Sequence, residues 1–191
     1  MTPGHGKGLR AAVVFAHPHT EHGGTMHTKV VYQASKALSR IGCAVLRFNF
    51  RGAGASPGSF TNGPGEIDDF RAALDFLHDR YADAPMWAGG MSFGSYVALT
   101  VGAEDPRVST LIGIALPIAR YDFEPVARSS KPKFFIHGER DELCPLKEMR
   151  EFYARCAEPK ELVVIDAADH LFDGRVGEVA DAVEDLLGDW S

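Results

Sequence analysis

Cysteine is scarce in this sequence. The three present, Cys43, Cys144 and Cys156, are an odd number and show no CxxC spacing. A disulfide framework uses cysteines in pairs, and a thiolate zinc site uses closely spaced ones. We therefore expect reduced thiols, which fit a cytoplasmic protein better than a secreted one.

Long apolar runs and an excess of positive charge are missing as well. Runs such as Leu111 to Leu116 are far too short to span a bilayer, and the opening MTPGHGKGLR lacks the apolar core of a signal peptide. The formal net charge is −6, which argues against nucleic acid or an anionic membrane surface as the main partner. We expect a soluble, cytoplasmic protein with neither of these partners.

The remaining composition is that of an ordinary globular protein. Hydrophobic residues make up 45% and charged residues 24% of the 191 residues. A chain of this length is expected to form one domain, here residues 1–191, and to bury roughly 70% of its unfolded surface. A monomer and a homodimer are both compatible with the sequence.

Short, nearly continuous apolar runs recur along the chain and are typical of parallel strands that are buried on both faces. The predicted strands are Ala11 to Ala16, Ala44 to Phe50, Met86 to Gly89, Thr110 to Ala115, Lys133 to His137 and Leu162 to Ile165. Because longer segments separate them, we expect right-handed crossovers between about six mostly parallel strands.

Amphipathic segments lie between these runs. Helices are predicted from about Met26 to Ile41, Ile67 to Tyr81, Phe93 to Ala103, Leu146 to Ala157 and Val176 to Trp190. Together with the strands they indicate an α/β fold with helices on both faces of the sheet. About seventeen residues separate the fourth and fifth strands, which leaves no room for a cap domain, so we expect a shallow, open site.

Two pentapeptides match the pattern G-x-S-x-G, around Ser56 and around Ser92. A catalytic serine in this pattern needs a strand before it, a helix after it and a backbone N–H on the next residue. Ser56 is followed by Pro57, which has no N–H, and by a glycine-rich loop. Ser92 lies between a predicted strand and a predicted helix, so we predict that Ser92 is the nucleophile.

A serine hydroxyl needs a histidine base, and the histidine needs a carboxylate that orients it. His170 follows the last predicted strand in the loop AADHLF, and Asp141 follows the fifth strand in the turn HGERDELCP. We predict His170 as the base and Asp141 as the acid, with Glu139 and Glu142 as alternatives to Asp141. His137, which ends a buried strand, is interpreted as structural.

The oxyanion of an acyl-transfer intermediate is stabilised by two backbone N–H groups. Phe93 directly follows Ser92, and His19 lies in the loop His17-Pro18-His19-Thr20 after the first strand, where Pro18 cannot donate. We predict that the N–H groups of Phe93 and His19 form the oxyanion hole. The same loop has enough histidines to suggest a metal, but no further ligands follow at a recognisable spacing, so no metal or cofactor is predicted.

Several longer motifs resemble the α/β-hydrolase superfamily, in particular its compact lidless branch of bacterial proteins. They are the loop HPHT, the segment Gly23 to His27, the block RFNFRGAGASPG over Arg47 to Gly58, GEIDD over Gly65 to Asp69, the elbow around Ser92, and Asp169-His170. The resemblance covers nearly the whole chain. It implies the α/β-hydrolase fold, a Ser-Asp-His triad and esterase or thioesterase-like activity without a cofactor. The sequence departs from the family pattern in two places: only ten residues precede the first predicted strand, so we expect the usual first two strands to be missing, and Thr20 follows His19 where the family loop often reads HPHP.

The sequence therefore predicts a serine hydrolase, carboxylesterase or thioesterase-like, that cleaves small acyl esters or thioesters through an acyl-enzyme on Ser92. Its partner would be a small-molecule acyl substrate. Two alternatives stay open at this point: a non-catalytic binding protein that retains the fold, and an acyltransferase that uses the same triad. Neither the acyl chain nor the leaving group follows from the residues.

Overall fold

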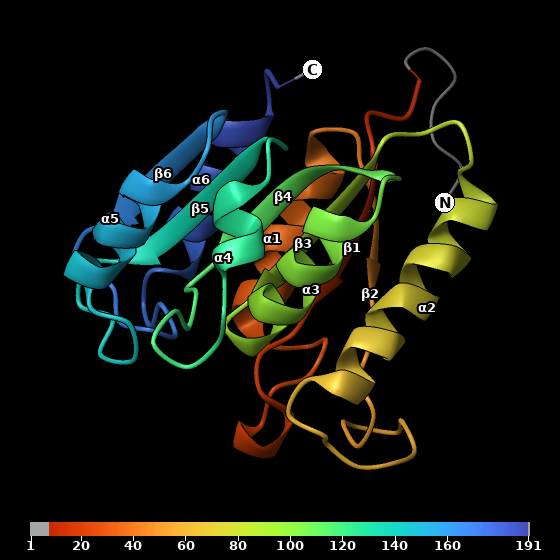
Figure 1. Ribbon diagram of the computed structural model, residues 1–191, viewed down its shortest axis with the longest axis horizontal. Coiled ribbons are helices and arrows are strands. Elements are labelled where there is room, and N and C mark those ends of the chain that lie inside the picture. The colour runs from red at the N-terminus through yellow and green to blue at the C-terminus, as the bar shows by residue number, and fades with distance from the viewer. Residues whose placement is uncertain (1–7, 191) are drawn as a thin grey trace.

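The computed structural model describes residues 8–190, which form one six-stranded sheet with helices on both sides (Figure 1). The strands are β1 Ala12–Ala16, β2 Ala44–Arg47, β3 Met86–Met91, β4 Val108–Ile114, β5 Lys133–Gly138 and β6 Lys160–Ile165. Their order is β2-β1-β3-β4-β5-β6, and every neighbouring pair is parallel. The six predicted strands and their parallel pairing are confirmed.

The second strand is shorter than predicted, ending at Arg47 rather than Phe50. Beyond Arg47 the chain makes hydrogen bonds away from the sheet. The Asn49 Oδ1 accepts the Met26 N–H at 2.9 Å, and the Phe50 N–H donates to the His17 Nε2 at 3.0 Å. The apolar pattern continues because Phe50 is still buried, so hydrophobicity alone could not mark the end of this strand.

The helices follow the predicted segments closely. They are α1 Lys29–Arg40, α2 Pro64–Arg80, α3 Phe93–Glu104, α4 Glu124–Arg128, α5 Leu146–Arg155 and α6 Val176–Leu187, with a short 3-10 helix η1 at Thr20–His22. The first helix begins three residues later than predicted, because residues 25–28 form a turn in which the Thr28 N–H donates to the Thr25 carbonyl at 2.9 Å.

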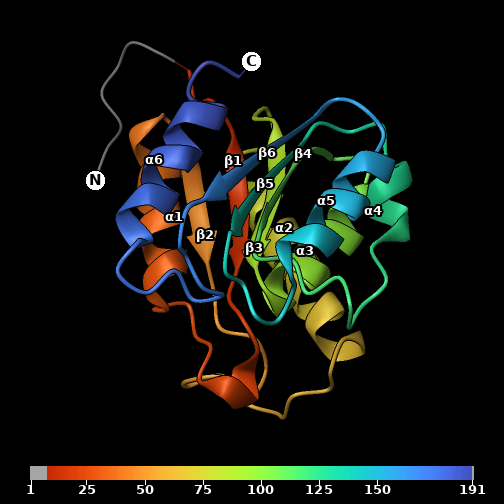
Figure 2. The same cartoon turned by 90° about the vertical axis from the view of Figure 1, so that its left-hand side faces the viewer.

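Three layers build the molecule. Helices α1 and α6 lie together on one face of the sheet, and α2, α3, α4 and α5 cover the other (Figure 2). Each face has its own apolar core: Val30, Leu38 and Val183 pack on the first, and Phe70, Val97 and Phe152 on the second. A sheet buried on both faces explains why its strands are apolar along their whole length.

All strands run in the same direction, so the loops that follow them meet at one edge of the sheet. The 3-10 helix η1 after β1 and the long loop after β2 lie together at the lower edge in both views (Figures 1 and 2). Between β4 and β5 the chain forms only the five-residue helix α4 and loops, so nothing in residues 8–190 caps this edge. Within the same described range, no helix combines the length and the apolar composition needed to cross a membrane.

Candidate active site

Ser92 occupies a sharp turn between β3 and α3. Its backbone has φ +52° and ψ −123°, a conformation that a residue with a side chain rarely adopts. The turn lifts the side chain above the edge of the sheet and places the serine at the N-terminus of a helix. The strand and helix predicted around Ser92 are both present.

The two glycines around Ser92 are required by close packing. A Cβ atom on Gly90 would lie 2.4 Å from the Gly94 carbonyl oxygen, and one on Gly94 would lie 2.3 Å from the His17 carbonyl oxygen. No real Cβ atom approaches an oxygen this closely. The start of α3 therefore packs directly against the end of β1, which brings the loop after β1 beside Ser92.

His170 reaches Ser92 from the loop after β6. Its Nε2 lies 2.9 Å from the Ser92 Oγ, and its Nδ1 lies 2.8 Å from the Asp141 Oδ2. An ionised carboxylate can only accept, so the Nδ1 carries the proton and the Nε2 accepts the Ser92 hydroxyl proton. The three predicted residues, separated by up to 78 positions in the sequence, thus form one hydrogen-bonded chain.

Asp141 is held in an arrangement that favours the charged carboxylate. Its Oδ1 accepts the N–H groups of Leu143 and Cys144, both at 2.9 Å. Burial by itself raises the pKa of the Asp141 carboxyl, but the hydrogen bonds from His170 and Cys144 outweigh burial and hold this pKa below its usual value. Asp141 therefore carries a full negative charge at neutral pH.

The loops that carry the acid and the base are locked to each other. A Cβ atom on Gly138 would lie 2.5 Å from the Ala168 carbonyl oxygen and 2.7 Å from that of Asp169. The Arg140 N–H also donates to the Ala168 carbonyl at 2.8 Å. This close contact sets the spacing between Asp141 and His170 through backbone packing rather than through the two side chains alone.

The alternative acids make other contacts. The Glu139 Oε2 accepts the Ala167 N–H at 2.8 Å, and the Glu142 Oε2 accepts the His170 backbone N–H over 3.5 Å. Among the described residues, Asp141 alone has a carboxylate oxygen within hydrogen-bond distance of the His170 ring. Ser56 also lies apart from this network, because its Oγ donates to the Asn49 carbonyl at 3.0 Å.

The residues predicted to form the oxyanion hole share a small hollow with Ser92. A cavity of about 40 Å³ lies against the side chains of His19, His22, Ser92, Phe93, Pro117, Arg120, Tyr121 and Leu143. Among residues 8–190, neither the His19 N–H nor the Phe93 N–H donates to another group. Both N–H groups are thus available to a ligand.

Aromatic rings form much of the wall of this hollow. The His19 ring stacks on His22, with centroids 4.2 Å apart, and it also contacts Phe60 and Phe93. Burial lowers the pKa of His19, which keeps its imidazole neutral at pH 7. In the described part of the chain no group of three His, Cys, Asp or Glu side chains gathers as a metal-ligand set.

Two buried histidines support the site, and sequence reasoning had missed the role of one of them. The His17 Nδ1–H donates to the Pro18 carbonyl at 2.6 Å, and its Nε2 accepts the Phe50 N–H. Burial lowers the pKa of His17, as this arrangement requires, because a protonated Nε2 could not accept. The sequence feature that could have indicated this role of His17 is a histidine directly before a proline at the end of the first strand.

His137 lies behind Asp141. Its Nε2–H donates to the Cys144 carbonyl at 2.8 Å, and the same nitrogen lies 3.8 Å from the Asp141 Oδ2. The side chain is fully buried, and burial lowers its pKa. His137 therefore holds the turn that carries Asp141, in agreement with the structural interpretation.

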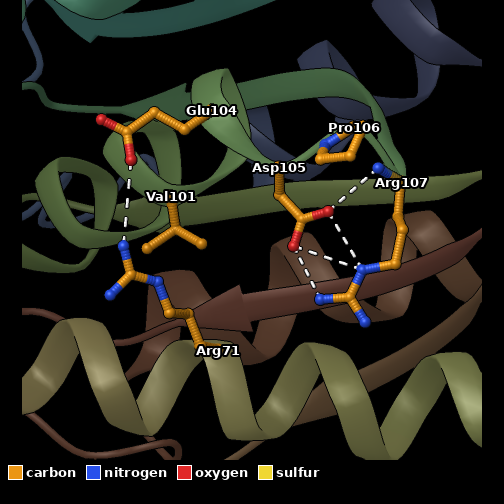
Figure 3. A pocket seen from close by; sticks show the side chains of 6 residues that line it. All are labelled: Arg71, Val101, Glu104, Asp105, Pro106 and Arg107. Atoms are coloured by element: carbon orange, nitrogen blue, oxygen red, sulfur yellow. Dashed lines mark hydrogen bonds and ion pairs between the residues drawn. The ribbon is translucent and has the colours of Figure 1, made fainter.

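A larger groove lies at the opposite end of α3. Its volume is about 420 Å³, and it is lined by Arg71, Val101, Glu104, Asp105, Pro106 and Arg107 (Figure 3). The charges in it pair with one another: Arg107 with Asp105 at 2.7 Å, and Arg71 with Glu104 at 3.8 Å. These ion pairs leave no free charge directed into the groove, so we place the site at the smaller hollow.

Known proteins resemble this chain over most of its length. A family model described as alpha/beta hydrolase domain matches residues 9–186. A protein of Rickettsia prowazekii is 35% identical over 180 residues, which cover 90% of this chain and 76% of that protein.

Solved structures show the same architecture. An alpha-beta serine hydrolase homologue from Coxiella burnetii is 34% identical, with a TM-score of 0.89 over 95% of this chain and 88% of that one. A serine hydrolase without a lid from Xanthomonas campestris is 32% identical, with a TM-score of 0.89 over 95% of this chain and 83% of that one. The chain therefore shares the minimal, lidless form of this fold.

Proposed function

The chain belongs to the α/β-hydrolase family, and on that premise we propose that it is a serine hydrolase of small, accessible acyl esters or thioesters. The observation that carries the proposal is the buried chain from the Ser92 Oγ through His170 to Asp141, with hydrogen bonds of 2.9 and 2.8 Å. Three side chains from three separate strand ends meet in the order that acyl transfer requires. A binding protein would have no use for this arrangement.

In the first half of the reaction the Ser92 Oγ attacks the carbonyl carbon of the substrate, and the His170 Nε2 takes the hydroxyl proton. The imidazolium that forms is stabilised by the adjacent Asp141 carboxylate. The N–H groups of His19 and Phe93 donate to the oxyanion, and each such donor contributes roughly 3 kcal/mol. The N-terminus of α3 adds its positive dipole at the same point.

The first half ends when the imidazolium returns its proton to the leaving alcohol or thiol as the carbonyl re-forms, which leaves an acyl group on Ser92. The second half repeats these steps with water. Water then attacks the acyl-enzyme, again with His170 as the base, and the acid is released with the serine regenerated. Protein side chains and backbone N–H groups supply every step, so the chemistry needs no cofactor or metal.

The form of the hollow supports small substrates. Its volume of about 40 Å³ is far below the roughly 300–1,000 Å³ of sites that enclose drug-sized ligands. Ser92 is 8% exposed, so a substrate reaches its Oγ only through this hollow. The Coxiella and Xanthomonas neighbours are named as serine hydrolases, which supports the same reaction class here.

The test is the hydrolysis of p-nitrophenyl esters of increasing acyl length by the wild type, Ser92→Ala and Ser56→Ala. The last variant is a matched control, because it removes the same hydroxyl from the same five-residue pattern. We expect turnover of short-chain esters by the wild type and Ser56→Ala, and none above background by Ser92→Ala. A fluorophosphonate probe should label the wild type and fail to label Ser92→Ala.

Two other results would replace the proposal. No turnover of any ester or thioester, together with no fluorophosphonate label on Ser92, would favour a binding protein of the same fold. Turnover in which an added alcohol outcompetes water for the acyl-enzyme would favour an acyltransferase instead.

A further inference from the structure

The hollow at Ser92 has a permanent positive charge that the hydrolysis of a neutral ester does not use. Arg120, in the loop after β4, lines the same cavity as Ser92 and the two proposed oxyanion donors. The side chain is exposed. Its backbone is fixed by a turn in which its N–H donates to the Pro117 carbonyl at 3.0 Å.

The next residue holds this turn against the body of the protein. The Tyr121 ring stacks on Tyr96, with centroids 4.3 Å apart, and its hydroxyl donates to the Asn62 Oδ1 at 2.7 Å. The same ring meets Phe93 edge to face at 5.6 Å. Arg120 therefore extends from a well-packed loop at the rim of the hollow, and not from a mobile one.

The guanidinium of Arg120 has no partner in the described part of the chain, since neither an ion pair nor a side-chain hydrogen bond involves it there. The nearby buried carboxylate of Glu66 is occupied elsewhere, because it accepts the N–H groups of Thr61 and Gly63 and the Thr61 hydroxyl. Arg71 and Arg107 in the groove at the far end of α3, by contrast, are both paired.

Among the described residues, no acidic residue lines the hollow, although the exposed carboxylate of Glu21 lies close enough to act on the His19 ring. The N–H groups of His19 and Phe93 and the N-terminus of α3 all present partial positive charge. An anion bound here would meet one full charge and several donors, and a guanidinium matches carboxylate and phosphate geometry particularly well.

We propose that Arg120 makes this hydrolase selective for esters or thioesters that carry a carboxylate or phosphate near the scissile carbonyl. The inference rests on the proposed function and deepens it, because it names the chemical class of the substrate. Arg120 binds the anionic group and takes no part in bond making or breaking. The negative charge can belong to the acyl part or to the alcohol part of the substrate.

Two matched pairs of substrates distinguish a negative charge on the acyl part from one on the alcohol part. Mono-p-nitrophenyl adipate against its methyl ester varies the charge on the acyl side, and 4-acetoxybenzoate against 4-acetoxybenzamide varies it on the alcohol side. For each pair the ratio of kcat/KM, charged over neutral, is measured by pH-stat for the wild type, Arg120→Gln and Arg120→Lys. Dividing the variant's ratio by the wild-type ratio cancels the intrinsic reactivity of the esters.

We expect Arg120→Gln to lower this ratio about tenfold for at least one pair, as the loss of one charge-assisted contact would. Arg120→Lys should restore part of it, and added salt should shrink the difference. Arg80→Gln is the control: this exposed arginine at the end of α2 removes the same charge far from the hollow, and should leave both ratios unchanged.

The outcomes are distinguishable. Turnover of the neutral esters with ratios unaltered by Arg120→Gln would overturn the role of Arg120 and leave the proposed hydrolase intact. An equal loss with Arg80→Gln would assign the effect to net charge and also overturn it. No turnover of any of the four esters by the wild type, charged or neutral, would refute the proposed function itself, and this inference with it.

Discussion

The pattern G-x-S-x-G occurs twice in this chain, and its two copies lie in unlike surroundings. Around Ser92 the copy joins a central strand to a helix, and the serine hydroxyl meets His170 from another loop. Around Ser56 it lies in the loop between β2 and α2, and the hydroxyl donates to the nearby Asn49 carbonyl. The same five letters thus describe a candidate nucleophile in one place and a loop contact in the other.

The glycines of the two copies differ in the same way. Gly54 and Gly58 have φ angles of +56° and +88°, which favour glycine through the backbone conformation, and a Cβ atom on Gly54 would also lie 2.6 Å from the Asn49 Nδ2. Gly90 and Gly94 are glycines because a Cβ atom would collide with a carbonyl oxygen at 2.4 or 2.3 Å. The first requirement is local, while the requirement at Gly94 comes from another strand, which a sequence pattern does not express.

The largest expected effect is that of a substitution at Asp141, which tests whether the activity of Ser92 depends on a residue far away in the sequence. In Asp141→Asn the amide N–H₂ would favour the tautomer with the proton on His170 Nε2, which could not then accept from Ser92. We expect kcat/KM on p-nitrophenyl acetate to fall about 10³–10⁴-fold. Glu139→Gln, from the same turn, should stay close to the wild type. If the glutamate variant lost as much activity, the assignment of the acid would be wrong.

The close packing around Gly94 should make a larger side chain at this position destabilising. Gly94→Ala would force the start of α3 away from β1, and we expect the free energy of unfolding to fall by about 1–3 kcal/mol or more. Esterase activity should fall with it, because the shift moves Ser92 and the Phe93 N–H. Urea denaturation measures the first and p-nitrophenyl acetate hydrolysis the second. Wild-type stability in this variant would contradict the packing argument.

Acid should weaken the contact between the end of β1 and the segment that leads to Ser56. The pKa of His17 lies below its ordinary value of 6.5 because of burial, so the unfolded chain binds a proton more readily than the folded one. Its contribution is present above pH 6.5 and is lost as the pH falls, by at most about 1.4 kcal/mol for each pH unit. Urea denaturation at pH 7 and pH 5 measures this loss.

Variants identify the group responsible. His17→Gln should be less stable at pH 7 and show a smaller loss on acidification, with the remainder due to His137 and His19, whose pKa values burial also lowers. His27→Gln, which changes an exposed histidine, should keep the full wild-type loss. A pH dependence that His17→Gln leaves unchanged would rule out His17 as its source.

The smallest effect is expected from a substitution at a glycine of the copy around Ser56. A Cβ atom on Gly58 would meet only the Arg51 Cβ at 3.4 Å, so Gly58→Ala costs only the left-handed conformation, about 1 kcal/mol. Urea denaturation should show this loss, and the activity of the folded protein should match that of the wild type. A loss as large as that of Gly94→Ala would remove the distinction between the two kinds of glycine.

Much of the fold was visible in the sequence because buried parallel strands and amphipathic helices are local patterns. All six strands and the connection too short for a cap were predicted. The errors fell where tertiary contacts end an element, as at Arg47, where the chain leaves the sheet although Phe50 stays buried. Periodicity records burial, and burial continued past the end of the strand.

The candidate site was partly visible for a similar reason. Ser92 and His170 stood out by their position after strands, but the carboxylates of Glu139, Asp141 and Glu142 were equivalent by that criterion. Only the fold shows which one lies 2.8 Å from the imidazole. Arg120 drew no attention at all, because it is an ordinary exposed arginine in the sequence and becomes distinctive through the hollow it lines.

The sequence by itself determined the order of strands and helices, the strained turn at Ser92 and the residue types available at one edge of the sheet. Those properties follow from neighbours within a few residues. Tertiary structure alone decided which polar groups meet, which glycine lies against a distant carbonyl, and which arginine lines the hollow at Ser92 with no carboxylate partner among residues 8–190. These depend on distances of 2–4 Å between segments far apart in the chain, and such distances are set when the sheet assembles and its loops pack at one edge.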